Sequence, residues 1–315
     1  MICMKKWSLA VLALSVSIIS CAQKAKEKSK TNTNKADATI NTLLWKISGN
    51  GLEKPSYLFG TIHLLCADDA FLSENMKKAI SEADDVYLEV DMNNIMEMFG
   101  AIEKMKMRGD TTLKDLLSES DYKKVKAYFE EKSPLLPFSI LENFKPILSV
   151  SVVETGTVPC ENATMMEQLI MDEAKLKDKN VKGLETLSYQ AGILDSIPYK
   201  LQAEELVQYI NNSEKNEGNN EMNEMWDAYN NQDLKKLEEI MLKSEMGVSS
   251  YSEILLYRRN ENWIKKLKTL MPKGSLVVAV GAGHLPGNRG VIDLLRKAGY
   301  TVTPVENKTI KGKAI

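Results

Sequence analysis

The chain carries only two histidines, His63 and His284, and both occupy the same short motif. An apolar run ends in a glycine, Gly60 or Gly281, two residues follow, and histidine and leucine come next. A glycine at a strand end lets the backbone turn sharply or approach a ligand closely. Imidazole binds divalent metals and transfers protons near neutral pH, so the repeated motif predicts one site assembled from both ends of the chain.

Two histidines alone hold a metal weakly, so a carboxylate is expected beside them. Glu89 lies in the apolar run VYLEVD and is the best candidate, either as a metal ligand or as a catalytic carboxylate. Glu185 follows VKGL and is the second candidate for taking a proton from water. For each of the two carboxylates, the alternative is a polar strand face turned to solvent.

A further group of polar side chains lies in the run YRRNENW. Arg259 could steady a substrate or an oxyanion, and Asn260 would support the site together with Gly60, Gly281 and Gly283. The alternative is a cluster of charges that lines a solvent-exposed helix.

An α/β fold would bring these residues together. Apolar patterns predict strands over residues 42–48, 55–62, 85–91, 180–184, 275–280 and 300–305, and helices over 73–83 and 290–297. Strands that alternate with helices predict an α/β fold with a central sheet. The middle, from about residue 94 to 270, predicts a mainly helical insertion, with helices over 112–132, 163–177, 199–211, 221–229, 233–243 and 252–270 and a polar loop over 211–220.

The composition excludes one class of protein. The 315 residues include 41 Lys and Arg and 43 Asp and Glu, a net charge of −2. A nucleic-acid-binding protein would need a basic surface to neutralise phosphates, so no nucleic-acid partner is expected.

The N-terminus predicts secretion and a lipid anchor. Two lysines precede an apolar run that is short for a membrane span, and the run ends in IISC, a loose bacterial lipobox. We expect a signal peptide over residues 1–20, a lipidated Cys21 with a flexible tether over 21–41, a folded domain over 42–309 and a short tail over 310–315. A plain signal peptide is the alternative. The expected location is the bacterial cell envelope, at the outer membrane and facing the periplasm.

Two cysteines remain in the folded part, Cys66 and Cys160. In an oxidising compartment they most simply form one disulfide. The alternative, a pair of thiolate metal ligands, lacks the CxxC spacing of such sites.

The ordered motifs resemble the TraB/GumN family. The similarity covers about residues 43 to 304 and is carried by LLWKISGNG, PSYLFGTIHL, VYLEVDM, VKGLETLSYQ, YRRNENW and GAGHLPGNRGVIDLLRKAGY. The resemblance implies a fold related to erythromycin esterase and ChaN-like proteins, with His63, His284, Glu89 and Arg259 around one site. The animal relatives include the TIKI metalloproteases, which implies a divalent metal, manganese or cobalt rather than zinc, and a peptide or protein substrate.

Three hypotheses follow. The first is a membrane-anchored metallohydrolase, most simply a peptidase, in which His63, His284 and Glu89 bind the metal. The second is a metal-independent, esterase-like hydrolase that uses the histidines for proton transfer. The third is a non-enzymatic protein that binds haem, iron or peptides.

Overall fold

A computed structural model describes residues 41–132, 136–155, 158, 160, 162–214, 218–243 and 251–308. The predicted signal peptide, Cys21, the tether and the tail over 310–315 lie outside the described residues. No helix within the described ranges is both long and apolar enough to cross a membrane.

A six-stranded sheet forms the centre of the fold, with strand order β6-β4-β7-β2-β1-β8. The strands β6, β4, β7 and β2 are parallel neighbours, whereas β1 pairs antiparallel with both β2 and β8. Their bounds are β1 Leu44–Ser48, β2 Ser56–Thr61, β4 Asp85–Leu88, β6 Asn180–Gly183, β7 Leu276–Gly281 and β8 Thr301–Val305. A separate ladder pairs β3, Leu65–Cys66, with β5, Ala163–Thr164. The predicted α/β sheet is confirmed.

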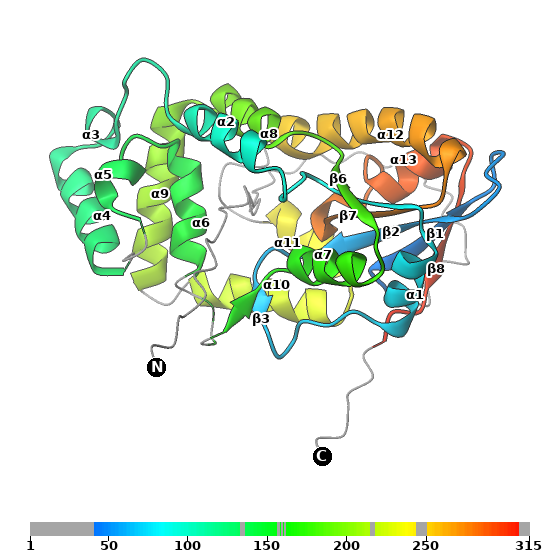
Figure 1. The fold of residues 1–315 in the computed structure, drawn as a ribbon. Coiled ribbons are helices and arrows are strands. Elements are labelled where there is room, and N and C mark those ends of the chain that lie inside the picture. The colour runs from blue at the N-terminus through cyan, green and yellow to red at the C-terminus, as the bar shows by residue number, and fades with distance from the viewer. Residues whose placement is uncertain are drawn as a thin grey trace, which may run out of the picture.

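Helices cover both faces of the sheet (Figure 1). Alternate residues of the buried strands contact the helices of opposite faces. Val277 and Ala279 pack with α1, Glu74–Glu82, and α7, Met166–Leu176. Val278 and Val280 pack with the helices of the other face, α12, Arg258–Leu270, and α13, Val291–Lys297. Ser73 caps α1 by accepting a hydrogen bond from the backbone N–H of Met76, as its sequence pattern predicts.

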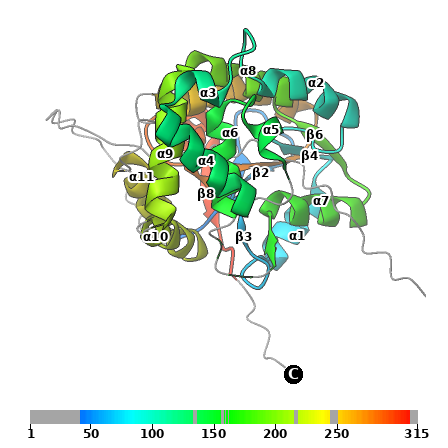
Figure 2. The same cartoon turned by 90° about the vertical axis from the view of Figure 1, so that its left-hand side faces the viewer.

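The long middle of the chain forms a helical region beside the sheet (Figures 1 and 2). Its remaining helices are α2 Ile95–Met105, α3 Leu113–Leu116, α4 Glu119–Lys132, α5 Phe138–Leu141, α6 Pro146–Thr155, α8 Leu187–Ile193, α9 Tyr199–Glu214, α10 Gly218–Asn230 and α11 Leu234–Lys243. Two further apolar cores, separate from those on the sheet, hold α2–α6, α8 and α9 together. The helices α10 and α11 instead pack into a core of the sheet through Ala228, Tyr229, Leu237 and Ile240. The predicted helical insertion is confirmed.

Four boundaries differ from the sequence prediction. The strand expected over 85–91 ends at Leu88, and the helix expected over 112–132 is broken into α3 and α4. The loop expected over 211–220 is helical up to Glu214 and again from Gly218. The helix expected over 252–270 begins with a π-helical turn, Glu253–Tyr257. The spacing of apolar residues along the chain did not predict these breaks, because packing against the rest of the fold determines where the helices and the strand end.

Candidate active site

The four parallel strands deliver one polar side chain each at the same edge of the sheet. Glu185 follows β6, Glu89 follows β4, His284 follows β7 and His63 follows β2. Carboxyl ends of parallel strands are where α/β sheets bind ligands. His63 and His284, which are 221 positions apart in the sequence, therefore lie at the same edge of the sheet.

His284 is held in one tautomer by the buried Asn260. The amide nitrogen of Asn260 donates to the carbonyl oxygens of Arg289 (2.9 Å) and His284 (3.4 Å), so its Oδ1 faces Nδ1 of His284 at 2.6 Å. An oxygen there requires a proton on Nδ1, which leaves the lone pair on Nε2. Burial lowers the pKa of His284 to about 3, partly offset by the charge of Glu89, so the ring is neutral.

The Nδ1 nitrogen of His63 lies beside a carboxylate. This nitrogen lies 2.8 Å from Oε1 of Glu167, a buried residue of α7. Burial opposes the charged imidazolium and is the largest single effect, but the charge and close contact of Glu167 together with the charge of Glu89 outweigh it and raise the pKa of His63 to about 9. Both histidines thus hold Nδ1 against an oxygen, an arrangement that is typical of metal-ligating histidines.

The side chains of Glu89, His284 and His63 converge on Gly281. A Cβ atom added there would lie 3.3 Å from Oε1 of Glu89, 3.6 Å from Cδ2 of His284 and 3.8 Å from Nε2 of His63. We call Nε2 of His63, Oε1 of Glu89 and Nε2 of His284 the donor cluster. The glycine is required because a side chain would fill the space between these atoms.

The donor cluster suits a divalent metal in chemistry and in size. Oε1 of Glu89 lies 3.8 Å from Nε2 of His284, and two metal bonds of about 2.1 Å span up to about 4.2 Å. Imidazole nitrogens with one carboxylate are ligands of transition metals. Within the described ranges no group of three or more His, Cys, Asp or Glu side chains is arranged to hold a metal ion. The side chains of the donor cluster would therefore have to move to bind one.

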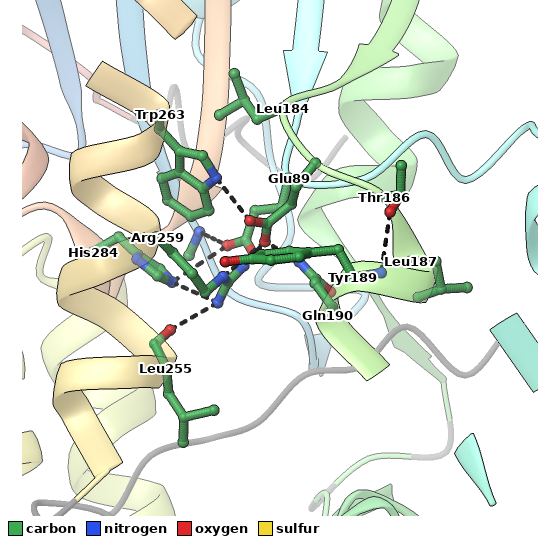
Figure 3. A network of polar contacts seen from close by, with 12 residues as sticks. Glu89, Leu184, Thr186, Leu187, Tyr189, Gln190, Leu255, Arg259, Trp263 and His284 are labelled. Atoms are coloured by element: carbon green, nitrogen blue, oxygen red, sulfur yellow. Dashed lines mark hydrogen bonds and ion pairs between the residues drawn. The ribbon is translucent and has the colours of Figure 1, made fainter. Parts of the chain in front are cut away.

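Arg259 supplies the positive charge at the centre of the site (Figure 3). Its guanidinium donates to Oε2 of Glu89 (2.5 Å) and, through Nε, to Oε1 of Glu185 (2.7 Å), and its Nη1 lies 3.3 Å from Nε2 of His284. The π-helical turn before α12 presents the carbonyl oxygen of Leu255, which accepts from Nη1 at 3.0 Å. Burial alone would raise the pKa of the Glu89 carboxyl, but the charge of Arg259 holds it well below its usual range.

Glu185 is saturated by hydrogen-bond donors. Besides Arg259, its carboxylate accepts from Nε2 of Gln190 (2.8 Å) and from Nε1 of Trp263 (3.1 Å). Gln190 also donates to Glu89 at 3.1 Å and so links the two carboxylates. The indole ring of Trp263 packs 4.5 Å from the imidazole of His284, centroid to centroid.

The structure brings His63, His284, Glu89, Glu185, Arg259 and Asn260 together, and none of the six lies on an open solvent-facing surface. The supporting glycines have separate contacts: a Cβ at Gly60 would meet Ala282 at 3.1 Å, and one at Gly283 would meet Sδ of Met241 at 2.6 Å. Cys66 and Cys160 form the predicted disulfide.

Sequence reasoning did not single out Glu167 or Gln190. Gln190 lies in the run VKGLETLSYQ, five residues after Glu185, a spacing that places it on the next helix. Glu167 gave no signal, because its helix shows an ordinary alternation of charged and apolar residues.

Comparison with known proteins identifies the family of the chain. The model of the TraB/PrgY/gumN family matches residues 43–304, which is most of the chain. The chain belongs to the TraB/PrgY/gumN family. The recognised motifs are thus those of a TraB/PrgY/gumN protein, and both histidine motifs lie inside the matched range.

Several relatives of this TraB/PrgY/gumN chain are named metalloproteases. Metalloprotease TIKI1 of Xenopus tropicalis is 23% identical over 92% of this chain and 67% of its own length. Metalloprotease TIKI1 of Homo sapiens is 22% identical over 87% of this chain and 64% of its own length. The Uncharacterized protein YbaP of Shigella flexneri is 26% identical over 76% of this chain and 88% of its own length. The chain thus spans about two thirds of the TIKI proteins that it matches. No solved structure matches the chain.

Proposed function

We propose that the protein is a divalent-metal-dependent hydrolase that acts on peptide bonds. The observation that carries the proposal is the paired support of the two histidines, since each holds Nδ1 against an oxygen and leaves Nε2 on the side of the donor cluster. Relatives named metalloproteases support the same reaction class at low identity.

In this proposal His63, Glu89 and His284 hold the metal. The bound metal would polarise a scissile carbonyl and lower the pKa of a water molecule toward neutrality. Manganese or cobalt is favoured by the resemblance to the animal relatives, and zinc less so. Asn260 and Glu167 orient the two imidazoles and keep a proton on each Nδ1. Nε2 of the neutral His284 then has a lone pair to offer, and Nε2 of His63 has one once its second proton is displaced.

Arg259 steadies developing negative charge, on the substrate or on an oxyanion. Its guanidinium is fixed on two sides by Glu89 and Glu185, so it needs little rearrangement during the reaction. Because the oxygens of Glu185 already accept from Arg259, Gln190 and Trp263, we propose Glu185 as a positioning residue rather than the group that takes a proton. Glu89 is the other carboxylate beside the histidines, and it takes the proton of the water only in the version of the proposal in which it does not bind the metal.

We also propose that the mature protein is anchored to a bacterial cell-envelope membrane through a lipid on Cys21. The lipobox-like run IISC supports the anchor, and the Cys66–Cys160 disulfide suits an oxidising compartment. Detergent phase partitioning tests the anchor: a Cys21→Ser variant should move to the aqueous phase.

Elemental analysis of the purified protein, followed by cleavage of a peptide library with and without added Mn²⁺, tests the proposed activity. His63→Ala and His284→Ala should each abolish metal-dependent cleavage, while circular dichroism shows that the fold remains. Cleavage that survives in either folded variant would refute the assignment. Cleavage that is indifferent to EDTA would favour the metal-independent hydrolase, and a haem absorbance band on titration, without hydrolysis, would favour the binding protein.

A further inference from the structure

The Cys66–Cys160 disulfide ties together the two segments that hold His63 and Glu167. Its Cα atoms are 5.9 Å apart, and it closes a stretch of 94 residues. The same two segments pair as the ladder of β3 and β5, with Leu65 opposite Thr164 and Cys66 opposite Ala163. The backbone N–H of Ala67 extends this ladder by donating to Asn162 O at 2.9 Å.

The ladder leads directly to the donor cluster. Nearer the main sheet, the backbone N–H of Met166 donates to Ile62 O at 3.3 Å. The residues that follow these two in the sequence are His63 and Glu167, and Nδ1 of His63 lies 2.8 Å from Oε1 of Glu167. The disulfide, the ladder and the His63–Glu167 contact are therefore successive links between the same two segments.

Leu65 and Met166 share the apolar core on this face of the sheet, but the hydrogen bonds between the two segments are few. Each strand of the ladder has two residues, and isolated two-stranded ladders are marginally stable. Nδ1 of His63 and Oε2 of Glu167 are buried without a well-directed hydrogen bond, so no saturated network holds the pair. Trp226, which donates to Leu64 O at 2.9 Å, anchors one segment only.

All three residues of the donor cluster follow central strands of the main sheet: His63 follows β2, Glu89 follows β4 and His284 follows β7. They differ in their support, because only His63 takes its Nδ1 partner, Glu167, from the segment that the ladder and the disulfide hold, whereas the partner of His284, Asn260, comes from α12. Loss of the disulfide would thus loosen the contact of His63 with Glu167 and leave the rest of the donor cluster in place.

We infer that the redox state of Cys66–Cys160 controls the placement of His63 against Glu167, and through it the metal affinity of the donor cluster. The inference rests on the proposed function, because it assigns a regulator to the same metal site. A dithiol reductant breaks the S–S bond: two electrons and two protons pass to the two sulfur atoms, and the reductant becomes a disulfide. Both cysteines are partly exposed and open to such a reductant.

The test compares the oxidised protein, the protein reduced with dithiothreitol, and a Cys66→Ala/Cys160→Ala variant. Isothermal titration with Mn²⁺ should show about a 10-fold or greater loss of affinity in the last two, the range seen when an outer partner of a ligand is lost. Hydrogen exchange should accelerate over residues 61–67 and 162–167 and stay unchanged over 276–281. Glu167→Gln in the oxidised protein should weaken Mn²⁺ binding in the same way, and dithiothreitol should add nothing in the double alanine variant.

Affinities within twofold of each other, with equal exchange over 61–67, would overturn the inference while the proposed function stands. Faster hydrogen exchange over 276–281 as well would also overturn the inference, because the disulfide would then stabilise the whole fold rather than the placement of His63. If no form binds Mn²⁺, the proposed function fails and the metal part of the inference fails with it. A local change of exchange would then still show that the disulfide places His63.

Discussion

Replacing Arg259 by methionine tests whether one buried cation holds the site together. The side chains of Arg259, Glu89 and Glu185 are 10%, 11% and 8% exposed, and methionine roughly preserves the volume of arginine without its charge. The variant leaves two buried carboxylates without their main partner. Removing one partner of a buried ion pair costs about 3–5 kcal/mol, so we expect the free energy of unfolding to fall by at least about 3 kcal/mol. For a domain of this size that corresponds to a melting temperature lower by roughly 6–20 °C.

The loss should depend on pH in a defined direction. In the wild type the pKa of Glu89 is depressed below its usual value of 4.5, so its contribution to stability is present above that pH and is lost as the pH falls. Without Arg259, burial raises the pKa of Glu89, and the variant regains stability when acid neutralises this carboxyl. The difference in stability between wild type and variant should therefore be largest at neutral pH and shrink toward pH 4.5.

Urea unfolding followed by tryptophan fluorescence, at pH 7.5 and at pH 4.5, measures both effects. Arg289→Met is the matched control, because Arg289 also pairs with two glutamates, Glu253 and Glu261, but its side chain is 34% exposed. An exposed pair is worth at most about 1 kcal/mol. Equal losses in the two variants, or an Arg259→Met loss that does not change with pH, would refute the reasoning.

Two further predictions concern the metal. Gly281→Ala should abolish Mn²⁺ binding without unfolding the protein, because the added Cβ would lie 3.3 Å from Oε1 of Glu89 and 3.8 Å from Nε2 of His63, in the space that an ion would share. The control is Gly192→Ala, whose Cβ meets nothing within 4 Å. Unchanged Mn²⁺ binding in Gly281→Ala would contradict the proposed ligand set. The affinity for Mn²⁺ should rise about tenfold per pH unit from pH 7 until it levels off near pH 9, because the metal must displace the proton of His63, whose pKa is about 9; a flat profile in calorimetric titrations would show that His63 is not a ligand.

The sequence predicted the parts of the site that carry a local signature. His63 and His284 share a motif of strand, glycine and histidine, and strand ends of this kind meet at one edge of a parallel sheet. Glu89 was expected inside a strand, whereas the strand ends one residue earlier, so the prediction placed it near the site for a partly wrong reason. Cys66 and Cys160 pair as the cysteine count indicated.

The missed residues owe their roles to tertiary packing. Glu167 meets His63 only because the β3–β5 ladder sets α7 beside the end of β2, and no pattern within residues 163–177 encodes that contact. Gln190 bridges Glu89 and Glu185 because β4 and β6 are neighbours in the sheet. Strand order and helix placement arise from long-range packing, which a reading of local periodicity does not capture.

The position of β7 has a consequence for how the protein is made. This strand is synthesised after most of the chain, yet it lies between β4 and β2, which are made early. Until residues 276–281 emerge, the two early strands have no common neighbour, and His63 and Glu89 cannot be brought to one site. A polypeptide that lacks residues 276–281 therefore cannot assemble the donor cluster, and the late strand has to insert into the middle of the sheet. Contacts between such distant residues also make folding slow.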